Sequence, residues 1–423
     1  MDRRRRPDDP GPRGQVRGVA AEELRRHNLT AILEPLHLSG PMSRSALAKR
    51  TGLNRSTIAD LIGELSRLGL VEEGPGATNL GPGRPSPVAR ARPDGAVVLA
   101  LELSVDSIAV ATVGLGGHVY NQLRIARPRE RFSPEETAQD IGKLAEPLLA
   151  SLPDGHVLVG VGVAVAGVVR RTDGFVHLAP NLGWRNVALG ELVTAGLGLS
   201  GSVALANEAD LGALAEYLRG AGSGVHDLLY LAGEAGIGAG IIQDGRPMLG
   251  STGYAGEVGH TVVNPDGRRC RCGGKGCWET EAGEAALARR AGLGNSVGPG
   301  LLEQVKAQAE AGDARTLEAL AETGRWLGVG IGNLINIFNP EVVVVGGAYQ
   351  EIFPYLETSL LAGATAASLE APREAVTILP GVLGVDASLL GAAELVLSGV
   401  VGNPAEVTGI FPHLPTPVAE GGG

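Results

Sequence analysis

The chain begins with apolar residues at helical spacing. Between Glu22 and the Gly40-Pro41 pair, apolar side chains recur every three or four positions, which predicts one helix that ends before the proline. These positions are Leu24, Leu29, Ile32, Leu33 and Leu36. Residues 1–20 are rich in arginine and proline and contain few apolar side chains, which favours a flexible basic arm ahead of this helix.

Two shorter helices are predicted next. Ser43 can cap the first of them, and Thr51-Gly52-Leu53 predicts the turn that ends it. Asn54 or Ser56 can cap the second, whose inward positions are Ile58, Leu61, Ile62, Leu65 and Leu68. Two helices joined by a tight turn are typical of a helix-turn-helix, and residues 69–73 predict a strand that enters a wing. A plain three-helix bundle is the alternative.

Beyond Pro93, apolar runs alternate with helical stretches, which predicts an α/β fold. The runs are Val97–Leu101, Val157–Val165, Leu228–Leu231 and Val342–Val345. Residues 403–423 end in Glu-Gly-Gly-Gly and are predicted to be a tail. No signal peptide or long apolar segment precedes these elements, so we expect a cytoplasmic protein without a membrane partner.

Charge divides the chain into two parts. Residues 1–92 hold 16 Lys and Arg against 10 Asp and Glu, whereas residues 93–423 hold 20 against 36. A basic segment on an acidic body indicates nucleic-acid binding at one end. With 423 residues, of which 44% are hydrophobic, the chain is long enough for two or three packed cores.

The most informative chemistry lies at residues 256–279. This stretch contains Gly-Glu-Val-Gly-His and all 3 cysteines of the chain, Cys270, Cys272 and Cys277. Together with His260 they form a Cys₃His set, which binds zinc tetrahedrally and leaves no position open for water. We therefore predict a structural zinc site. Free thiols or a disulfide are the alternatives, and a reducing compartment disfavours the disulfide.

These residues resemble those of a known family. The pattern Gly-Glu-x-Gly-His, then Cys-x-Cys-Gly-x-x-Gly-Cys-x-Glu, is that of the ROK family of sugar kinases and sugar-responsive repressors, and residues 256–279 match it throughout. Residues 43–58 resemble the winged helix-turn-helix of ROK repressors, which the kinases generally lack. The resemblance covers about residues 22–400. It implies a two-lobed, ribonuclease-H-like domain, similar to actin and hexokinase, with a ligand in the cleft between its lobes.

The domain organisation follows from these patterns. We expect a basic arm at 1–20, a winged helix-turn-helix at 21–92, a ROK sugar-binding domain at 93–402 and a tail at 403–423. The zinc loop, residues 256–279, lies within the ROK domain.

The sequence departs from the ROK kinases where a phosphate would bind. Glu-Leu-Ser-Val-Asp at 102–106 replaces the kinase pattern Asp-x-Gly-Gly-Thr, so the backbone cannot approach a phosphate and Asp106 would repel it. The glycines at 236–240 are kept, and we attribute them to close packing. Glu208 stands where the kinases have their aspartate base, and its longer side chain moves the carboxylate by about a bond length.

The sugar half of the family's site is retained. The resemblance implies a sugar site made of Asn181, Asn207, Glu208, Glu257, His260 and Glu279. His260 would serve both sugar and zinc, and Gly167 would form the floor. The motifs at 179–184 and 207–209 most resemble the xylose-repressor branch, which favours D-xylose as inducer and leaves D-glucose and N-acetylglucosamine open.

For DNA contacts we expect side chains at the starts of the two short helices and in the wing. The set is Arg44, Asn54, Arg55, Ser56, Thr57 and Arg84. Arg84 lies in a proline-stiffened segment suited to a minor groove.

We therefore predict a sugar-responsive DNA-binding repressor without enzymatic activity. It would bind operator DNA as a homodimer or homotetramer, and sugar would change the spacing of its recognition helices. Two other functions stay open. One is an ATP-dependent sugar kinase with a fused DNA-binding domain, and the other is a regulator whose cleft no longer binds sugar.

Overall fold

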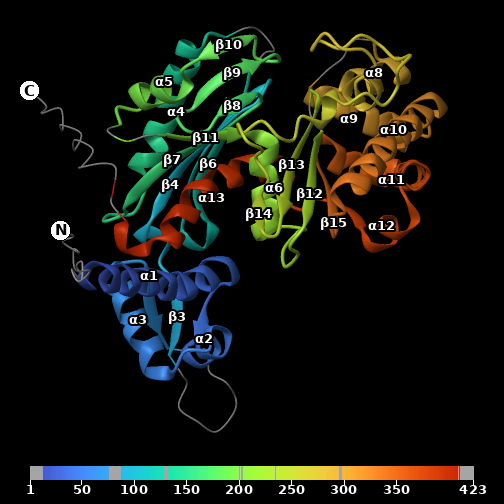
Figure 1. Cartoon of the computed structure of the whole chain (residues 1–423). Coiled ribbons are helices and arrows are strands. Elements are labelled where there is room, and N and C mark those ends of the chain that lie inside the picture. The colour runs from blue at the N-terminus through green and yellow to red at the C-terminus, as the bar shows by residue number, and fades with distance from the viewer. Residues whose placement is uncertain are drawn as a thin grey trace, which may run out of the picture. The chain divides into compact units, whose positions relative to one another are not determined.

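The computed structural model describes residues 13–75, 87–127, 132–199, 201, 203–233, 235–294, 298–407 and 409. The chain forms two compact units (Figure 1). The first contains the described residues up to Ala96, Gly114–Gly116 and residues 397–407. The second contains the described residues between Val97 and Val396 other than Gly114–Gly116, together with residue 409.

The first unit consists of three helices and a small antiparallel sheet among its described residues. The helices are α1 (Arg13–Ser39), α2 (Arg44–Thr51) and α3 (Arg55–Arg67). The sheet has the order β1-β3-β2, with β1 (Met42–Ser43), β3 (Val88–Ala91) and β2 (Val71–Gly74). Each helix contributes fully buried apolar side chains, among them Leu29, Leu33, Leu47, Ile58 and Ile62.

Polar side chains set the helix boundaries in this unit. The Ser43 hydroxyl accepts a hydrogen bond from Ala46 N at 3.2 Å and caps α2. The Asn54 side chain accepts from Thr57 N at 2.9 Å and caps α3. Between the two helices, Gly52 has a φ of 73°, a left-handed conformation that favours glycine. The predicted helix, turn and helix are therefore present at the expected residues.

Three details of this unit differ from the sequence prediction. Helix α1 begins at Arg13, inside the segment expected to be a flexible arm. Residues 21–26, Ala-Glu-Glu-Leu-Arg-Arg, are exposed and mostly good helix formers, so a nucleated helix extends through them without a buried face. Leu24, one of the apolar positions at helical spacing, is 62% exposed; Leu68, expected to point inward, is 39% exposed and caps the end of α3.

The C-terminal part of the chain contributes to the first unit. Thr30 of α1 donates a hydrogen bond to Val401 O at 2.9 Å. The short helix η5 (Pro404–Glu406) follows, with Pro404 buried. Residues 403–407, expected to belong to a tail, are thus packed, and residues 410–423 lie outside the described part of the chain.

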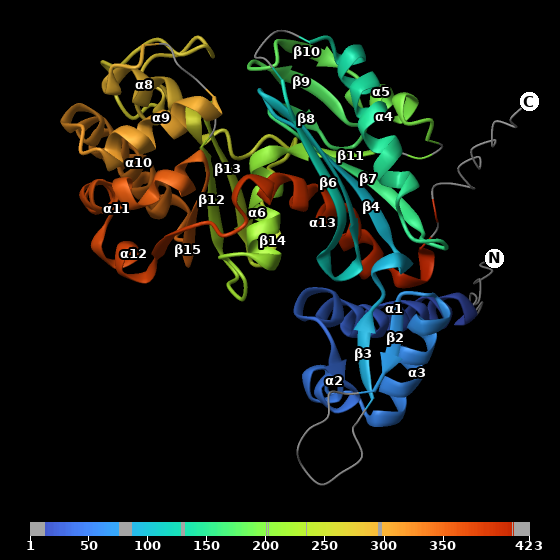
Figure 2. The same ribbon diagram turned by 180° about the vertical axis from the view of Figure 1, so that it is seen from behind.

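The first lobe of the second unit contains a five-stranded sheet in the order β11-β7-β4-β5-β6. Its strands are β4 (Val97–Leu103), β5 (Ser107–Gly114), β6 (His118–Ala126), β7 (Leu158–Val165) and β11 (Val203–Asn207). A three-stranded sheet adjoins it, with β8 (Val168–Arg170), β9 (Phe175–Ala179) and β10 (Trp184–Val187). Helices α4 (Pro134–Ala150) and α5 (Leu189–Gly196) share one apolar core with the larger sheet (Figure 2).

The second lobe is built on a sheet in the order β14-β13-β12-β15-β16. Its strands are β12 (Leu228–Gly233), β13 (Ile237–Gln243), β14 (Arg246–Pro247), β15 (Val342–Gly347) and β16 (Thr377–Pro380). Its helices are α7 (Trp278–Ala282), α8 (Glu284–Ala291), α9 (Pro299–Glu310), α10 (Ala314–Phe338), α11 (Ala348–Ala367) and α12 (Glu370–Ala375). Helices α7 to α11 bury one face of this sheet.

Two helices lie between the sheets of the two lobes. Helix α6 (Glu208–Arg219) packs on the second sheet, where its residues share a core with β12 and β15. Helix α13 (Ala387–Gly402) approaches both β7 and α6, since a Cβ on Gly162 would lie 1.9 Å from Ala392 O and a Cβ on Gly391 1.9 Å from Leu211 O. The apolar runs predicted from the sequence are strands β4, β7, β12 and β15, and the predicted α/β organisation is confirmed.

Helix α13 also accounts for the longest apolar stretch. Within the described ranges, residues 384–402 form the one helix that is long and apolar enough to cross a membrane by length and composition alone. Of that stretch, 56% is buried inside the protein. Its position between β7 and α6 accounts for its apolar character.

Candidate functional site

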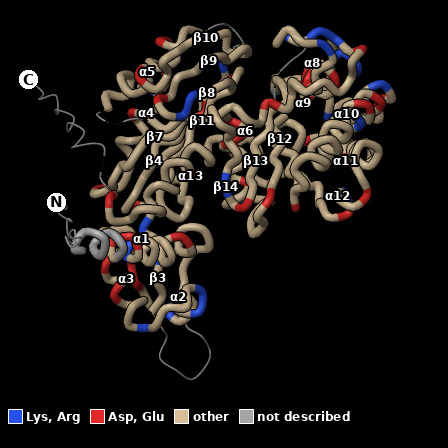
Figure 3. Tube along the Cα trace, viewed as in Figure 1, with Lys and Arg blue, Asp and Glu red and all other residues tan. Residues whose placement is uncertain are grey.

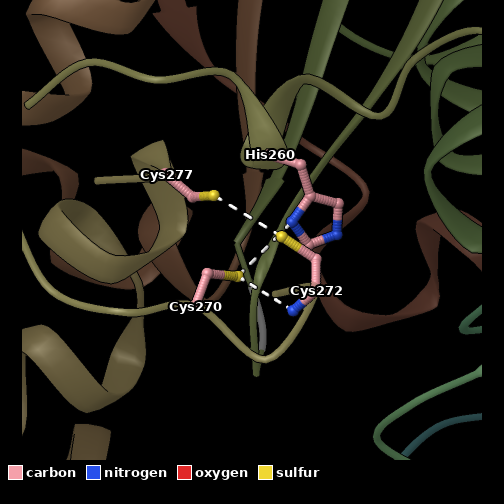
Figure 4. A group of neighbouring side chains, drawn as sticks. All are labelled: His260, Cys270, Cys272 and Cys277. Atoms are coloured by element: carbon pink, nitrogen blue, oxygen red, sulfur yellow. Dashed lines mark hydrogen bonds between the residues drawn. The ribbon is translucent and has the colours of Figure 1, made fainter. Parts of the chain in front are cut away.

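Four side chains with metal-binding atoms converge in the segment between β14 and α7 (Figure 4). His260 ends the short helix η3 (Val258–His260), and Cys277 directly precedes α7. Cys270 and Cys272 lie in the loop between them. Their ligand atoms all lie within 4.8 Å of one another. The structure thus brings together the four residues that the spacing predicted.

The distances in this cluster fit a tetrahedral zinc ion. Cys272 Sγ and Cys277 Sγ are 3.7 Å apart, and Cys270 Sγ and His260 Nδ1 are also 3.7 Å apart. Zinc–sulfur bonds of about 2.3 Å in a tetrahedron place two sulfur atoms roughly 3.8 Å apart. Gly274 leaves room for such a centre, because a Cβ there would lie 3.3 Å from Cys277 Sγ and 3.4 Å from Cys272 Sγ.

The protein environment acts differently on the three thiols. The backbone N–H of Gly274 donates to Cys272 Sγ at 3.4 Å and lowers the pKa of Cys272. Burial raises the pKa of Cys270 and of Cys277. The Cys270 thiol donates to Glu279 Oε1 at 2.9 Å, which places Glu279 beside the cluster. A coordinated divalent cation deprotonates such thiols, so the donor set suits a metal.

A narrow pocket lies next to the cluster, between the two lobes of the second unit. Its cavity volume is about 30 Å³, room for about one water molecule, so a larger ligand would have to widen it. Its lining residues are Gly167, Val168, Val169, Asn207, Asp210, Gly238, Ala239, Gly253, Tyr254, Ala255, Gly256 and Glu257. The pocket therefore brings together three residues expected at a ligand site: Asn207, Glu257 and Gly167.

Asn207 shapes this pocket through its side-chain amide. Its Oδ1 accepts a hydrogen bond from Ala209 N at 2.7 Å, which caps α6. Its Nδ2 donates to Gly167 O at 2.9 Å, which fixes the turn between β7 and β8. One side chain thus holds the start of α6 against the predicted floor of the pocket.

Two acidic side chains line the pocket. Burial raises the pKa of Asp210 to about 7, while the nearby Arg171 lowers it and Glu257 raises it further. Burial likewise raises the pKa of Glu257, and the nearby His260 lowers it. Sequence comparison missed Asp210. The available signal was its place three residues after Asn207, on the same side of a helix.

The other residues expected to bind sugar do not line this pocket. Asn181 accepts a hydrogen bond from Arg271 Nη1 at 3.1 Å and lines a second small pocket in the first lobe. His260 Nδ1 faces Cys270, whereas its Nε2 lies 4.0 Å from Glu257 Oε2. Glu208 begins α6, and its carbonyl accepts from the Ser388 hydroxyl at 3.0 Å. His260 therefore stands between the cysteine cluster and the pocket.

Side chains in the segment at 102–106 are held by contacts within the protein. Buried Glu102 pairs with Arg124 at 2.8 Å, and Ser104 Oγ donates to Glu102 Oε1 at 2.9 Å. Arg124 also lies 3.1 Å from Asp386, which directly precedes α13. A guanidinium group of the protein thus neutralises Glu102.

Close packing accounts for two of the glycines at 236–240. A Cβ on Gly240 would lie 2.4 Å from Ala209 O, and a Cβ on Gly238 would lie 3.0 Å from Ala209 Cβ. These glycines let β13 approach α6, which agrees with the sequence interpretation.

In the first unit, four of the residues expected to contact DNA lie together at the start of α3. Asn54 caps the helix, and the Ser56 hydroxyl donates to Asn54 Oδ1 at 2.7 Å. Arg55 and Ser56 are exposed and Thr57 is half-buried. Basic residues also lie at the end of α2, which carries Lys49 and Arg50 (Figure 3).

The two remaining residues of that set stand apart. Arg44 donates two hydrogen bonds to Glu73 of β2, one of them from Nε to Oε1 at 2.7 Å. Arg84 lies outside the described residues.

A model of the ROK family matches residues 98–398. The chain belongs to the ROK family. The xylose repressor of Bacillus spizizenii is 28% identical to this ROK protein over 375 residues, which cover 88% of this chain and 96% of the repressor. The family resemblance seen in the sequence is therefore confirmed.

Two solved structures show how far the similarity of this ROK protein extends. A ROK family transcriptional regulator, a homolog of the E. coli MLC protein, is 27% identical with a TM-score of 0.73, covering 90% of this chain and 98% of that one. A ROK family glucokinase from Streptomyces griseus, in complex with glucose and AMPPNP, is 28% identical with a TM-score of 0.61. That match covers 72% of this ROK protein and 100% of the glucokinase.

Proposed function

We propose that this protein is a sugar-responsive transcriptional repressor. The observation that carries the proposal is the extent of the similarity. The glucokinase is matched over its whole length by 72% of the chain, whereas the regulator matches 90% of it. The chain thus contains a complete kinase-like domain and a further segment that the regulator shares. The Bacillus relative that matches 88% of the chain is a xylose repressor.

The first unit supports DNA binding as a winged helix-turn-helix. Helices α2 and α3 with the Gly52 turn provide the helix-turn-helix, and β2 and β3 provide the strands of a wing. Helix α3 is the recognition helix in this proposal. Exposed Arg55 and Ser56, with Thr57, reach bases and phosphates in the major groove, while Asn54 holds the start of the helix. Arg44 is bonded to Glu73 of β2, and Arg84, outside the described residues, stays a prediction from the sequence.

The pocket supports a monosaccharide as effector. Sugar hydroxyl groups donate hydrogen bonds to carboxylates, and Glu257 offers one on the lining. Tyr254 adds an aromatic wall, held edge-on by His177 of β9 at a centroid distance of 5.6 Å. Asn181, Glu208, His260 and Glu279 belong to the proposed site on the strength of the family motifs. D-xylose is the first candidate inducer, and D-glucose is the second.

The zinc site is structural in this proposal. Cys270, Cys272, Cys277 and His260 would hold the ion and fix the loop that carries Glu257 and Glu279. The closed segment at 102–106 supports the absence of kinase activity, because Asp106 and the Glu102–Arg124 pair occupy the region where a kinase needs glycines.

The proposed switch requires a cytoplasmic homodimer or homotetramer. Two recognition helices must lie about 34 Å apart, or a multiple of this distance, to read a palindromic operator. To change a protein population from mostly DNA-bound to mostly free, sugar would have to bind the state with the different helix spacing more tightly by roughly 10²- to 10⁴-fold, which is about 3 to 5.5 kcal/mol.

One experiment tests the function as a whole. The zinc-loaded protein is used to select its operator from random DNA, and fluorescence anisotropy then follows the complex as D-xylose or D-glucose is added. A coupled assay measures ADP release with MgATP. We expect sugar to release the DNA without ADP formation. ADP formation would instead establish the kinase, a sugar-insensitive complex would show a regulator that has lost its effector, and failure to select DNA would reject DNA binding.

A further inference from the structure

We propose that Asp210, rather than Glu208, supplies the carboxylate through which α6 recognises the sugar. The inference rests on the proposed function of the pocket as a sugar site. It differs from what the motif at 207–209 implies, because the motif points to Glu208. Asp210 and Glu257 then form the pair of acceptors that face the ligand.

Helix geometry separates the two candidates. Residues two positions apart on an α-helix differ by about 200° around its axis, so their side chains point to nearly opposite sides. Residues three apart lie on the same side. Asn207 and Asp210 are three apart, and both line the pocket. Glu208 does not line it, and its carbonyl is bonded to Ser388 at the start of α13.

The environment of Asp210 lacks protein donors. Across the described residues, no hydrogen bond or ion pair joins the Asp210 carboxylate to another side chain or to a backbone N–H. Arg171 affects the Asp210 carboxylate only through its charge. Within the described part of the chain, the Arg171 side chain forms no hydrogen bond. A half-buried carboxylate without protein donors is free to accept hydrogen bonds from a ligand that enters the pocket.

The chemistry of a sugar meets this need. Vicinal hydroxyl groups are donors with fixed spacing, and two carboxylates that line the same pocket can each accept from one of them. Arg171 keeps part of the negative charge on Asp210 despite its burial. The start of α6 also favours an anion, because the first turn of a helix carries a partial positive charge. Asp210 is therefore positioned as a sugar acceptor and is not needed to hold the helix, which Asn207 caps.

The test compares two isosteric substitutions in the full-length, zinc-loaded protein. Calorimetry measures the dissociation constants of D-xylose and D-glucose for the unchanged protein, for Asp210→Asn and for Glu208→Gln. A hydrogen bond to a charged group predicts a loss of roughly 10- to 100-fold in affinity for Asp210→Asn. The loss for Glu208→Gln is expected to be at least about fivefold smaller. The reverse order of the two losses overturns the inference.

A series of deoxy sugars separates a direct contact from an effect on folding. If Asp210 accepts from one hydroxyl, the sugar that lacks this hydroxyl binds the unchanged protein more weakly but binds Asp210→Asn as well as the parent sugar does. Equal, additive losses for every deoxy sugar would show that Asp210 acts through the fold and would reject the contact. If the unchanged protein binds neither sugar, the proposed function fails together with the inference, whereas a failure confined to the Asp210 comparison leaves the function intact.

Discussion

At the scale of single residues, the main feature of the pocket is a group of charged side chains that are partly buried. Asp210 and Glu257 are both acids whose pKa burial raises; Glu257 raises the pKa of Asp210 further, and Glu279 raises that of Glu257. Arg171 and His260 are the opposing charges. A pocket of this kind is unstable when every acid is ionised and no ligand is bound.

The raised pKa of Asp210 predicts a measurable dependence of stability on pH. Its pKa rises from the ordinary value of 3.8 to about 7, so the folded state favours the protonated form. The stability that this group contributes is fully present below about pH 4 and is lost as the pH rises through 7. Relative to Asp210→Asn, the unchanged protein should lose on the order of 1 to 4 kcal/mol of unfolding free energy between pH 4 and 8.

Urea unfolding of both proteins at several pH values measures this difference. The comparison cancels the titration of the other acids, which both proteins share. Parallel curves over the whole range would mean that Asp210 is solvated in the folded protein.

The sequence could predict part of this site and not the rest. Cys270, Cys272, Cys277 and His260 lie close together because their spacing leaves little freedom, and the structure brings them together. Asn207 and Glu257 followed from the family motif. Asp210 and Arg171 could not be found in this way, because their interaction depends on how β8 and α6 meet in space. The failure of Asn181 to line the pocket depends on the same tertiary geometry.

At the scale of elements, the sequence predicted the helix starts that a side-chain cap fixes. It did not predict the helix start that depends only on the helix propensity of the residues. Ser43 and Asn54 cap α2 and α3 as the pattern indicated, since each needs only residues two or three positions away. The start of α1 at Arg13 has no such local signal. The position of α13 between β7 and α6 depends on glycines whose need for close approach is visible only in the folded chain.

The zinc loop is the element whose removal should matter most. Cys272→Ser removes one of four ligands, so we expect loss of bound zinc, a lower thermal midpoint and weaker sugar binding. Elemental analysis after dialysis measures the metal, and calorimetry measures the sugar. Lys275→Ala is the matched control, because its side chain lies in the same loop and reaches Asp266 at 4.0 Å. A Cys272→Ser protein that kept both its zinc and its sugar affinity would contradict a structural role.

At the scale of the whole molecule, DNA binding and sugar binding are assigned to different units. Arg55→Ala should weaken operator binding by roughly 5- to 150-fold and leave sugar affinity unchanged, because its side chain is exposed at the start of α3. Glu257→Ala should weaken sugar binding by about tenfold or more and leave binding of sugar-free protein to the operator unchanged. Anisotropy and calorimetry on the same samples measure both quantities.

Arg67→Ala is the control for the first variant, since it removes the same charge at the opposite end of α3. A single variant that lost both functions would indicate misfolding. Loss of operator binding in Arg67→Ala as large as in Arg55→Ala would place the contact elsewhere on the unit.

Because every cysteine belongs to one cluster, the reactivity of the thiols reports the state of that cluster. Since the chain has 3 cysteines and all belong to the cluster with His260, a reagent that counts reactive thiols would count protein without the proposed zinc and nothing else. The same arrangement makes the cluster sensitive to oxidation. An oxidant has no other thiol on the chain to consume first, so oxidative damage would reach the loop that carries Glu257 directly, and a cell under oxidative stress would lose the sugar response before it lost the DNA-binding unit.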